Sequence, residues 1–162
     1  MNLVYINFNS TPDNRILEDI IKLHKSILGE SENIINQMKS KPQMLIDVAL
    51  DGEKVIAYKI GYGLDNDKFY SWLGGVDANY RNYGVASKLM EKQHQHLKRN
   101  GYKIVQTKTM NKWRSMLILN IKNGFDVIGT YNDENGETKI ILEKKLFSND
   151  KRGEKNVAII DF

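Results

Sequence analysis

The sequence of 162 residues contains no cysteine, which excludes disulfides, thiolate metal sites and a cysteine nucleophile. It also lacks any apolar run near the roughly 20 residues that a membrane-spanning helix needs. The first ten residues, MNLVYINFNS, have neither the basic start nor the long apolar stretch of a signal peptide. We therefore expect a cytoplasmic protein with no membrane partner. The length and the apolar fraction are those of one soluble globular domain.

Acidic residues are comparatively scarce in the second half of the chain. Residues 1–80 hold 8 Lys/Arg and 11 Asp/Glu, whereas residues 81–162 hold 16 and 9, so the net charge changes from −3 to +7. A positive second half favours an anionic partner, although solvated surface lysines give the same pattern. We expect no nucleic-acid partner, because Trp113, Phe125 and Tyr131 fall on apolar stripes rather than among exposed basic residues.

The most informative stretch of the sequence is a strand, a tight loop and a helix. Phe69–Val76 is apolar and aromatic and predicts a strand, which the polar turn Asp77–Tyr83 follows. After Gly84, the apolar residues that share one helical face are Val85, Ala86, Leu89, Met90 and Leu97. The first N–H groups of a helix lack internal partners and can bind a phosphate. Gly84 lets a ligand approach the main chain, and Arg81 adds a positive charge. An ordinary strand-to-helix turn is the alternative that these residues leave open.

Further strands and helices are expected on both sides of this unit. The expected strands are Asn2–Phe8, Met44–Leu50, Val55–Tyr62, Lys103–Thr109, Phe125–Tyr131 and Thr138–Leu146. Helices are expected from Thr11-Pro12-Asp13 to Gly29, between Ser31 and Pro42, and over Trp113–Ile121. The pair Asp51-Gly52 predicts a hairpin between two of the strands.

The expected domain covers residues 1–146, and residues 147–162 are expected to form an extension. Phe147–Asn156 is polar and charged, as in a linker. Val157–Phe162 is apolar again. Three interpretations stay open for this last stretch: an extra strand, a contact with a second subunit of a homodimer, or a frayed end.

The loop and the element order together resemble a known family. Residues 81–86, with Arg81, Gly84 and Ala86, have the form Arg/Gln-x-x-Gly-x-Gly/Ala, and the strand ends at Val76. This resembles the acetyl-CoA-binding motif of the GNAT family of N-acetyltransferases, and the resemblance extends over roughly residues 2–146. It implies an α+β fold with a mixed, mostly antiparallel sheet of six to seven strands. That sheet is splayed at one parallel pair and flanked by about four helices.

The resemblance also implies an activity and a binding mode. An acetyl group would pass from acetyl-CoA to a primary amine of a small molecule or protein, by direct attack in a ternary complex and without a metal. Pantetheine would pair with the backbone of Gly74, Gly75 and Val76, and an N–H near Val76 would stabilise the oxyanion. The pyrophosphate would meet the backbone amides of Asn82, Tyr83, Gly84, Val85, Ala86 and Ser87. Lys88 would lie near the adenosine phosphate.

The sequence departs from the family pattern where many members carry a tyrosine as general acid. That position, four residues before Gly124, holds Asn120. We expect Asn120 to point inward from an apolar stripe that contains Trp113, Met116 or Leu117, and Ile121. Its amide would then bond either to neighbouring backbone or to the CoA thiol. Because a thiol has a pKa of about 8.5, its thiolate leaves tolerably without an acid. A CoA-binding regulatory module without transferase activity is the alternative.

The remaining candidates have less specific patterns. The family's usual asparagine is Trp113 here, and Asn111 is expected to replace it in the cofactor site. Tyr70, Asp77 and a water relay are candidate general bases. The three histidines are expected to be structural: His24, His94 and His96.

Overall fold

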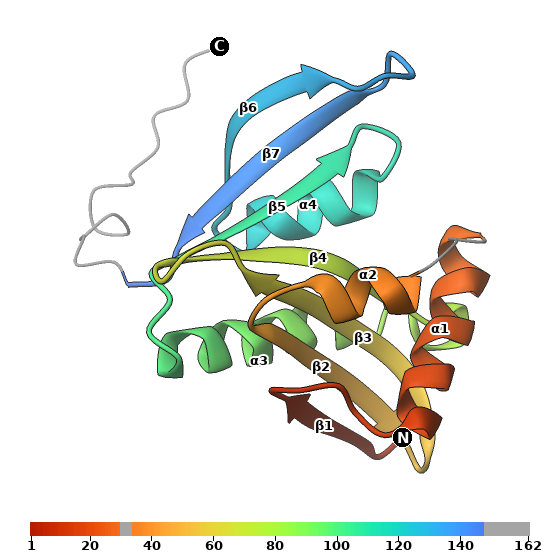
Figure 1. Ribbon diagram of the computed structural model, residues 1–162. Coiled ribbons are helices and arrows are strands. Elements are labelled where there is room, and N and C mark those ends of the chain that lie inside the picture. The colour runs from red at the N-terminus through yellow and green to blue at the C-terminus, as the bar shows by residue number, and fades with distance from the viewer. Residues whose placement is uncertain (30–33, 148–162) are drawn as a thin grey trace.

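The computed structural model describes residues 1–29 and 34–147 (Figure 1). Its elements are β1 (Leu3–Phe8), α1 (Asn14–Leu28), α2 (Ile34–Ser40), β2 (Met44–Asp51), β3 (Lys54–Gly63), β4 (Lys68–Val76), α3 (Val85–Arg99), β5 (Ile104–Met110), α4 (Arg114–Lys122), β6 (Asp126–Asn132) and β7 (Thr138–Lys145). The predicted order of elements is confirmed, and the observed bounds lie close to the predicted ones. The expected helix start at Ser31 and the apolar stretch Val157–Phe162 lie outside the described residues.

The strands form one seven-stranded sheet in the order β1-β2-β3-β4-β5-β7-β6. The pair β4–β5 is parallel, and the other five neighbouring pairs are antiparallel. This confirms the expected mixed sheet with one parallel pair. The hairpin predicted at Asp51-Gly52 joins β2 to β3.

Helices cover both faces of the sheet, and β2 in its interior is buried on both sides. Ile46 and Val48 of β2 pack into the same cluster as Leu17 and Ile20 of α1. The alternate residues of β2 belong to clusters on the α3 side: Leu45 and Ala49. Because successive side chains of a strand point to opposite faces, α1 and α2 cover one face, and α3 and α4 cover the other (Figure 1).

The parallel pair β4–β5 separates part of the way along its length, as Figure 1 shows. Pairing runs from Lys68↔Ile104 to Ser71↔Thr107 and then stops, although β4 continues to Val76. The Thr107 hydroxyl donates a hydrogen bond of 3.0 Å to the Ser71 carbonyl, which fastens this last pair. We call Ser71 and Thr107 the splay point, and the β4 residues 72–76 beyond it the open edge.

A β-bulge lies beside the splay point. On the β3 side, Leu73 faces Ile60 and Ser71 faces Gly61, so Trp72 is an extra residue in β4. Both Trp72 and Leu73 consequently pack against the α1 cluster, where a regular strand would turn one of them away. The bulge bends β4 away from β5, and it exposes the main chain of the open edge on the side that faces β5.

Candidate active site

The N-terminus of α3 has no side-chain cap. Its N-cap residue is Gly84, in the left-handed region with φ 75°, and no side chain of the described residues bonds to this end. The first intrahelical bond runs from the Lys88 N–H to the Gly84 carbonyl, at 3.0 Å. The N–H groups of Val85, Ala86 and Ser87 are therefore available to a ligand, and the helix dipole gives them positive character.

The loop before α3 is shaped to expose its main chain. Asn82 also has a positive φ, 68°, so the two left-handed residues, Asn82 and Gly84, are separated only by Tyr83. A Cβ on Gly84 would meet nothing within 4 Å, so its backbone angle, and not packing, demands glycine there. Tyr83 is 66% exposed and does not cover the loop. Successive N–H groups in such a turn form a concave anion-binding site.

Arg81 and Asp77 hold the loop in place. The Nε of Arg81 donates to the Val76 carbonyl at 3.3 Å, which ties the loop back to the end of β4. Asp77 accepts a bond of 2.9 Å from the Asn79 N–H and lies 3.5 Å from the Lys54 ammonium. Both carboxylate oxygens of Asp77 thus have partners, which weighs against the prediction that it acts as a general base.

A groove of about 450 Å³ extends from the start of α3 along the helix towards the end of α4 and β7. Its lining includes Gly84 and Ser87 at the helix start. It also includes three cationic side chains: Lys88, Lys98 and Lys144. Glu91 is the acidic residue in the lining. The groove therefore suits a molecule that carries several negative charges.

His94 lies in the wall of this groove, buried and only partly bonded. The Lys144 ammonium is 3.2 Å from its Nδ1, and Nε2 has no partner among the described residues. Because a lysine ammonium can only donate, Nδ1 accepts and the ring proton lies on Nε2. Burial, with Lys144 as the next cause, lowers the pKa of His94 to about 2, so the ring is neutral. The sequence analysis expected His94 to be structural, and the structure places it in the wall of the groove.

The other two histidines have structural partners. His24 is buried in α1, and its Nδ1 lies 2.6 Å from the Tyr58 hydroxyl. His96 lies 2.7 Å from the buried Asp47 carboxylate. Asp47 also accepts a bond of 3.1 Å from the Asn7 amide, so it joins α3 to β1 and β2.

The two glycines of the open edge, Gly74 and Gly75, differ in how closely other atoms approach them. A Cβ on Gly75 would lie 2.7 Å from the Ile27 Cδ1 of α1 and 3.2 Å from the Tyr58 side chain, so a larger residue there would require these side chains to shift. A Cβ on Gly74 would meet its nearest neighbour at 3.5 Å, an ordinary contact. The β-bulge does not include either glycine, because it lies at Trp72. Val76 ends the strand and packs on the α3 side.

Asn120 is buried, as expected, but only part of the apolar stripe predicted around it packs. Asn120 is 2% exposed, whereas Trp113 is 42% and Ile121 is 52% exposed. Leu117 of the predicted stripe packs against the core together with Leu119. The Asn120 carbonyl accepts hydrogen bonds from the N–H groups of Asn123 and Phe125 at the end of α4. The two interpretations of its side-chain amide, a bond to neighbouring backbone and a bond to the CoA thiol, both stay predictions.

The expected placement of the three aromatic residues needs correction, and the expected role of Asn111 stays a prediction. Of the three aromatics placed on apolar stripes, Phe125 is buried, but Trp113 and Tyr131 are 42% and 41% exposed and lie close to lysines. The argument against nucleic acid therefore fails for two of its three residues. Asn111 is exposed in the turn between β5 and α4. Its predicted contact with the cofactor stays a prediction.

Tyr70 lies next to the splay point on the face opposite α3. Burial is the main cause that raises the pKa of Tyr70 to about 12, with Tyr62 and Tyr131 contributing. The phenol therefore keeps its proton near neutral pH, and it can donate a hydrogen bond but cannot act as a base. The sequence analysis named Tyr70, but it missed the aromatic and cationic residues around it, which come from separate strands and from the turn between α2 and β2.

The described residues contain neither a candidate membrane-spanning helix nor a candidate metal site. None of the helices in residues 1–29 and 34–147 combines the length and apolar character that crossing a membrane requires. In the same ranges, no three histidine or acidic side chains are grouped closely enough to hold a metal ion.

Solved structures share this fold. A GNAT family acetyltransferase from Elizabethkingia anophelis with acetyl-CoA bound has a TM-score of 0.70 and 19% identity, with 89% of this chain and 98% of that chain covered. The ribosomal-protein-S18-alanine N-acetyltransferase from Escherichia coli has a TM-score of 0.73 and 16% identity, with 90% of this chain and 97% of that chain covered. The aminoglycoside 6'-N-acetyltransferase from Enterococcus faecium has a TM-score of 0.75 and 12% identity, with 91% of this chain and 99% of that chain covered.

The sequence comparisons give one match. No curated protein matches the chain. The family profile described as "Acetyltransferase (GNAT) family" matches residues 15–114, which is more than half of the chain. That range includes the loop with Arg81 and Gly84, both strands of the splayed pair and the whole of α3. The chain therefore belongs to the GNAT acetyltransferase family.

Proposed function

We propose that the protein transfers the acetyl group of acetyl-CoA to a primary amine, which attacks the thioester directly in a ternary complex. The observation that carries this proposal is the uncapped start of α3, which directly follows a strand with an open edge. The first can hold a diphosphate and the second can pair with an extended arm. The structural neighbour with acetyl-CoA bound supports the same ligand.

The length of the open edge fits the ligand. The five steps from Val76 back to Ser71 span roughly 17 Å at about 3.3 Å per residue. In this proposal the diphosphate meets the amides of residues 82–87, and the arm follows the open edge from Val76. Its thioester then reaches the splay point. The lysines of the groove, including Lys88, compensate the remaining phosphate charge.

The chemistry consists of one addition and one elimination. The neutral amine forms a bond to the acetyl carbonyl carbon, and a backbone N–H of the open edge beside the splay point stabilises the oxyanion. Val76, which the sequence analysis named for this role, lies at the far end of the open edge and would bind the start of the arm instead. The carbon–sulfur bond then breaks, and the electron pair leaves on the CoA sulfur. The amine gives up one proton and the thiolate takes one up, so the products are an amide and a free thiol. Asn120 would donate a hydrogen bond to the sulfur without giving up its proton.

Asn120 also favours a second candidate function. An amide cannot act as a general acid, so a CoA-binding regulatory module without transferase activity is the alternative. General acid catalysis typically contributes about 10²–10⁴-fold, and less where the leaving group is a thiolate. We therefore favour the enzyme, because the loss of a general acid is tolerable where a thiolate is the leaving group.

Two measurements test the proposal. Calorimetry should detect acetyl-CoA binding, and failure to bind at millimolar ligand would exclude both candidates. Thiol release should then be followed with acetyl-CoA and a panel of primary amines. Thiol release that depends on an amine supports the transferase, whereas binding with no release for any amine supports the regulatory module. The panel includes protein N-termini and small amines, since the neighbours are named for ribosomal protein S18 alanine and for aminoglycosides.

A further inference from the structure

Aromatic side chains meet on the face opposite α3, next to the splay point. The ring centroids of Tyr62 and Tyr70 are 5.5 Å apart, and those of Tyr62 and Trp72 are 6.0 Å apart, both edge to face. Phe69 belongs to the cluster on the α3 side, so Tyr70, the next residue, points to the opposite face. We call Tyr62, Tyr70, Trp72 and Tyr131 the aromatic surface.

Two lysines lie over the rings of this surface. The Lys41 ammonium is 4.8 Å from the ring centroid of Tyr62 and 5.3 Å from that of Trp72. The Lys108 ammonium is 5.8 Å from Tyr70 and 5.2 Å from Tyr131. Neither lysine forms an ion pair with any residue in the ranges 1–29 and 34–147. The ring faces stabilise these charges only partly, so both ammonium groups can still bind an anion.

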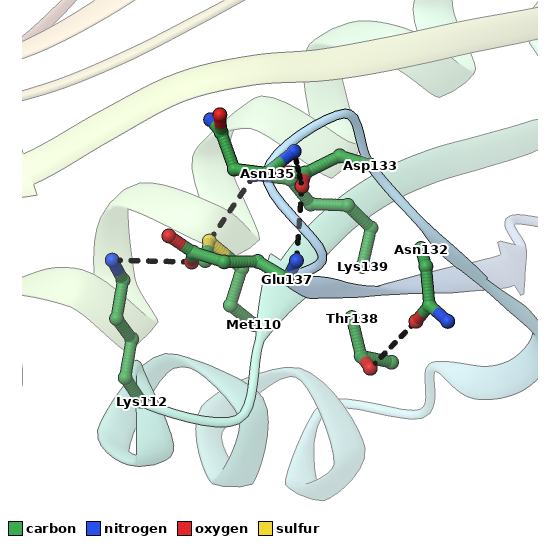
Figure 2. A network of polar contacts seen from close by, with 8 residues as sticks. All are labelled: Met110, Lys112, Asn132, Asp133, Asn135, Glu137, Thr138 and Lys139. Atoms are coloured by element: carbon green, nitrogen blue, oxygen red, sulfur yellow. Dashed lines mark hydrogen bonds and ion pairs between the residues drawn. The ribbon is translucent and has the colours of Figure 1, made fainter.

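Acidic side chains on the same part of the sheet are already paired, as Figure 2 shows for the turn between β6 and β7. Asp133 accepts bonds from the N–H groups of Asn135 and Glu137 and pairs with Lys139 at 3.7 Å. Glu137 pairs with Lys112 at 3.4 Å. On β7, Glu143 pairs with Lys68 at 2.9 Å. These carboxylates are poorly placed to receive the extra positive charges of a polyamine.

The position of the two lysines matches the place where an acceptor must bind. Lys108 follows Thr107 of the splay point directly, and Trp72 follows Ser71. The diphosphate site lies at the start of α3, on the other face of the sheet. An acetyl group that reaches the splay point from that side can be attacked from the side of the aromatic surface. The acceptor would then pass between Lys41 and Lys108.

From this arrangement we infer that the acceptor is an amine that also carries a carboxylate, which Lys41 and Lys108 bind beside the aromatic surface. The inference rests on the proposed transferase function and names its substrate class. A carboxylate fits better than a phosphate, because neither an arginine nor the start of a helix contributes to this cluster. Opposite charges at the site would also raise the rate at which such an acceptor is captured.

Matched acceptors test the inference at saturating acetyl-CoA. One pair is phenylalanine and phenylalanine amide, and the other is the amidated peptides Glu-Ala-Ala and Gln-Ala-Ala. Spermidine provides a polycation. We expect the carboxylate member of at least one pair to have a kcat/KM about tenfold higher, the value of one charge-assisted hydrogen bond. The pair that responds tells whether the carboxylate belongs to a free amino acid or to an acidic peptide.

The variants Lys41→Met and Lys108→Met keep the apolar stem over the rings and remove the charge. We expect each to raise the KM of the preferred acceptor severalfold and to leave the acetyl-CoA Kd unchanged. Lys112→Met is the control, because Lys112 also lies over a ring, that of Trp113 at 5.5 Å, but has Glu137 as its partner. Equal rates within both pairs, a preference for spermidine, or the same loss in the control would overturn the inference.

A binding measurement separates this inference from the proposed function. The chain has two tryptophans, so Trp113→Phe leaves the fluorescence of Trp72 as a reporter on the aromatic surface. In the complex with CoA, phenylalanine or the Glu peptide should change this fluorescence at lower concentration than its uncharged partner. Absence of that difference counts against the inference even if transfer occurs. Failure of acetyl-CoA to bind refutes the proposed function instead.

Discussion

The helices α1 and α3 both have 15 residues but begin in opposite ways. Asp13 caps α1, and its carboxylate accepts a bond of 3.0 Å from the Ile16 N–H. Gly84 begins α3 without a side chain, and its left-handed backbone leaves the first N–H groups open. A capped start contributes to stability, since it satisfies a donor that would otherwise lack a partner. An open start keeps those donors for a ligand, so the difference separates a structural helix from a binding helix.

The largest expected effect comes from closing the open start. In Gly84→Glu the new carboxylate would lie where the diphosphate binds, and its charge would repel the ligand. We expect the acetyl-CoA Kd to rise at least about 100-fold, which corresponds to roughly 2.7 kcal/mol. Calorimetry measures the Kd, and thermal unfolding shows that the variant is folded.

Gly136→Glu controls for the backbone strain of this change. Gly136 has a φ of 77°, and a Cβ there would also meet nothing within 4 Å. It lies in the turn between β6 and β7, beyond β5 from the strand that leads into the loop. We expect a similar loss of stability and an unchanged Kd. A control that binds as weakly as Gly84→Glu would trace the loss to strain, and the comparison of the two helix starts would then fail.

Arg81→Ala should produce the next largest effect. The exposed guanidinium is anchored by its Nε to the Val76 carbonyl, and its other N–H groups can reach a phosphate. We expect the acetyl-CoA Kd to rise about tenfold at low salt. The effect should shrink as the salt concentration rises, because exposed charges are screened.

Arg99 provides the matched control for this charge. It lies at the other end of α3 and is also exposed. Calorimetry at two salt concentrations should find a nearly unchanged Kd for Arg99→Ala. Equal effects at the two ends of α3 would mean that net charge, and not the loop, attracts the ligand.

Asp13→Ala removes the N-cap of α1, and it should lower the free energy of unfolding without changing ligand binding. Loss of an N-cap carboxylate typically costs about 1 kcal/mol. Urea unfolding should detect that change in the free energy of unfolding with an unchanged m-value. The acetyl-CoA Kd should stay the same, because the start of α1 lines neither the groove beside α3 nor the open edge of β4. Weaker binding by Asp13→Ala would contradict the division between the two helices.

Local sequence signals are enough to predict how α1 and α3 each begin. Asp13 after a proline and Gly84 after a polar turn are start signals that lie within a few residues of each helix. Apolar spacing then predicts which faces pack, and it correctly placed Met90 and Leu97 in the core. The order of the strands follows from the same kind of pattern, and so the fold and the open start of α3 were both predictable.

Features that depend on contacts between strands were not predictable. The bulge at Trp72 arises from the register with β3, which is a property of the pair and not of β4 alone. The aromatic surface joins residues of β3, β4 and β6, and no spacing in the sequence connects Tyr62 with Tyr131. For α4, apolar spacing failed because the helix is short and few of its residues pack against the sheet. Trp113 and Ile121 of the predicted stripe are exposed, whereas Leu117 packs against the core.

The smallest expected effect concerns the buried histidines of the two helices. His24 of α1 has the Tyr58 hydroxyl as its partner, whereas Nε2 of His94 in α3 has no partner among the described residues. Burial lowers the pKa of His94 in the folded protein below the value of about 6.5 in an unfolded chain. As the pH falls through 6.5, the unfolded chain therefore takes up a proton that the folded chain refuses, and stability decreases.

His94→Gln removes this titration and keeps an acceptor for the Lys144 ammonium. Between pH 7 and pH 6, the wild type should lose roughly 0.7 kcal/mol more free energy of unfolding than the variant does. Burial raises the pKa of Asp47, which acts with the opposite sign, but both proteins contain Asp47 and its contribution cancels. Urea unfolding at the two pH values measures the difference. Identical pH dependence would mean that folded His94 takes up a proton as readily as the unfolded chain, which a buried ring beside Lys144 should not do.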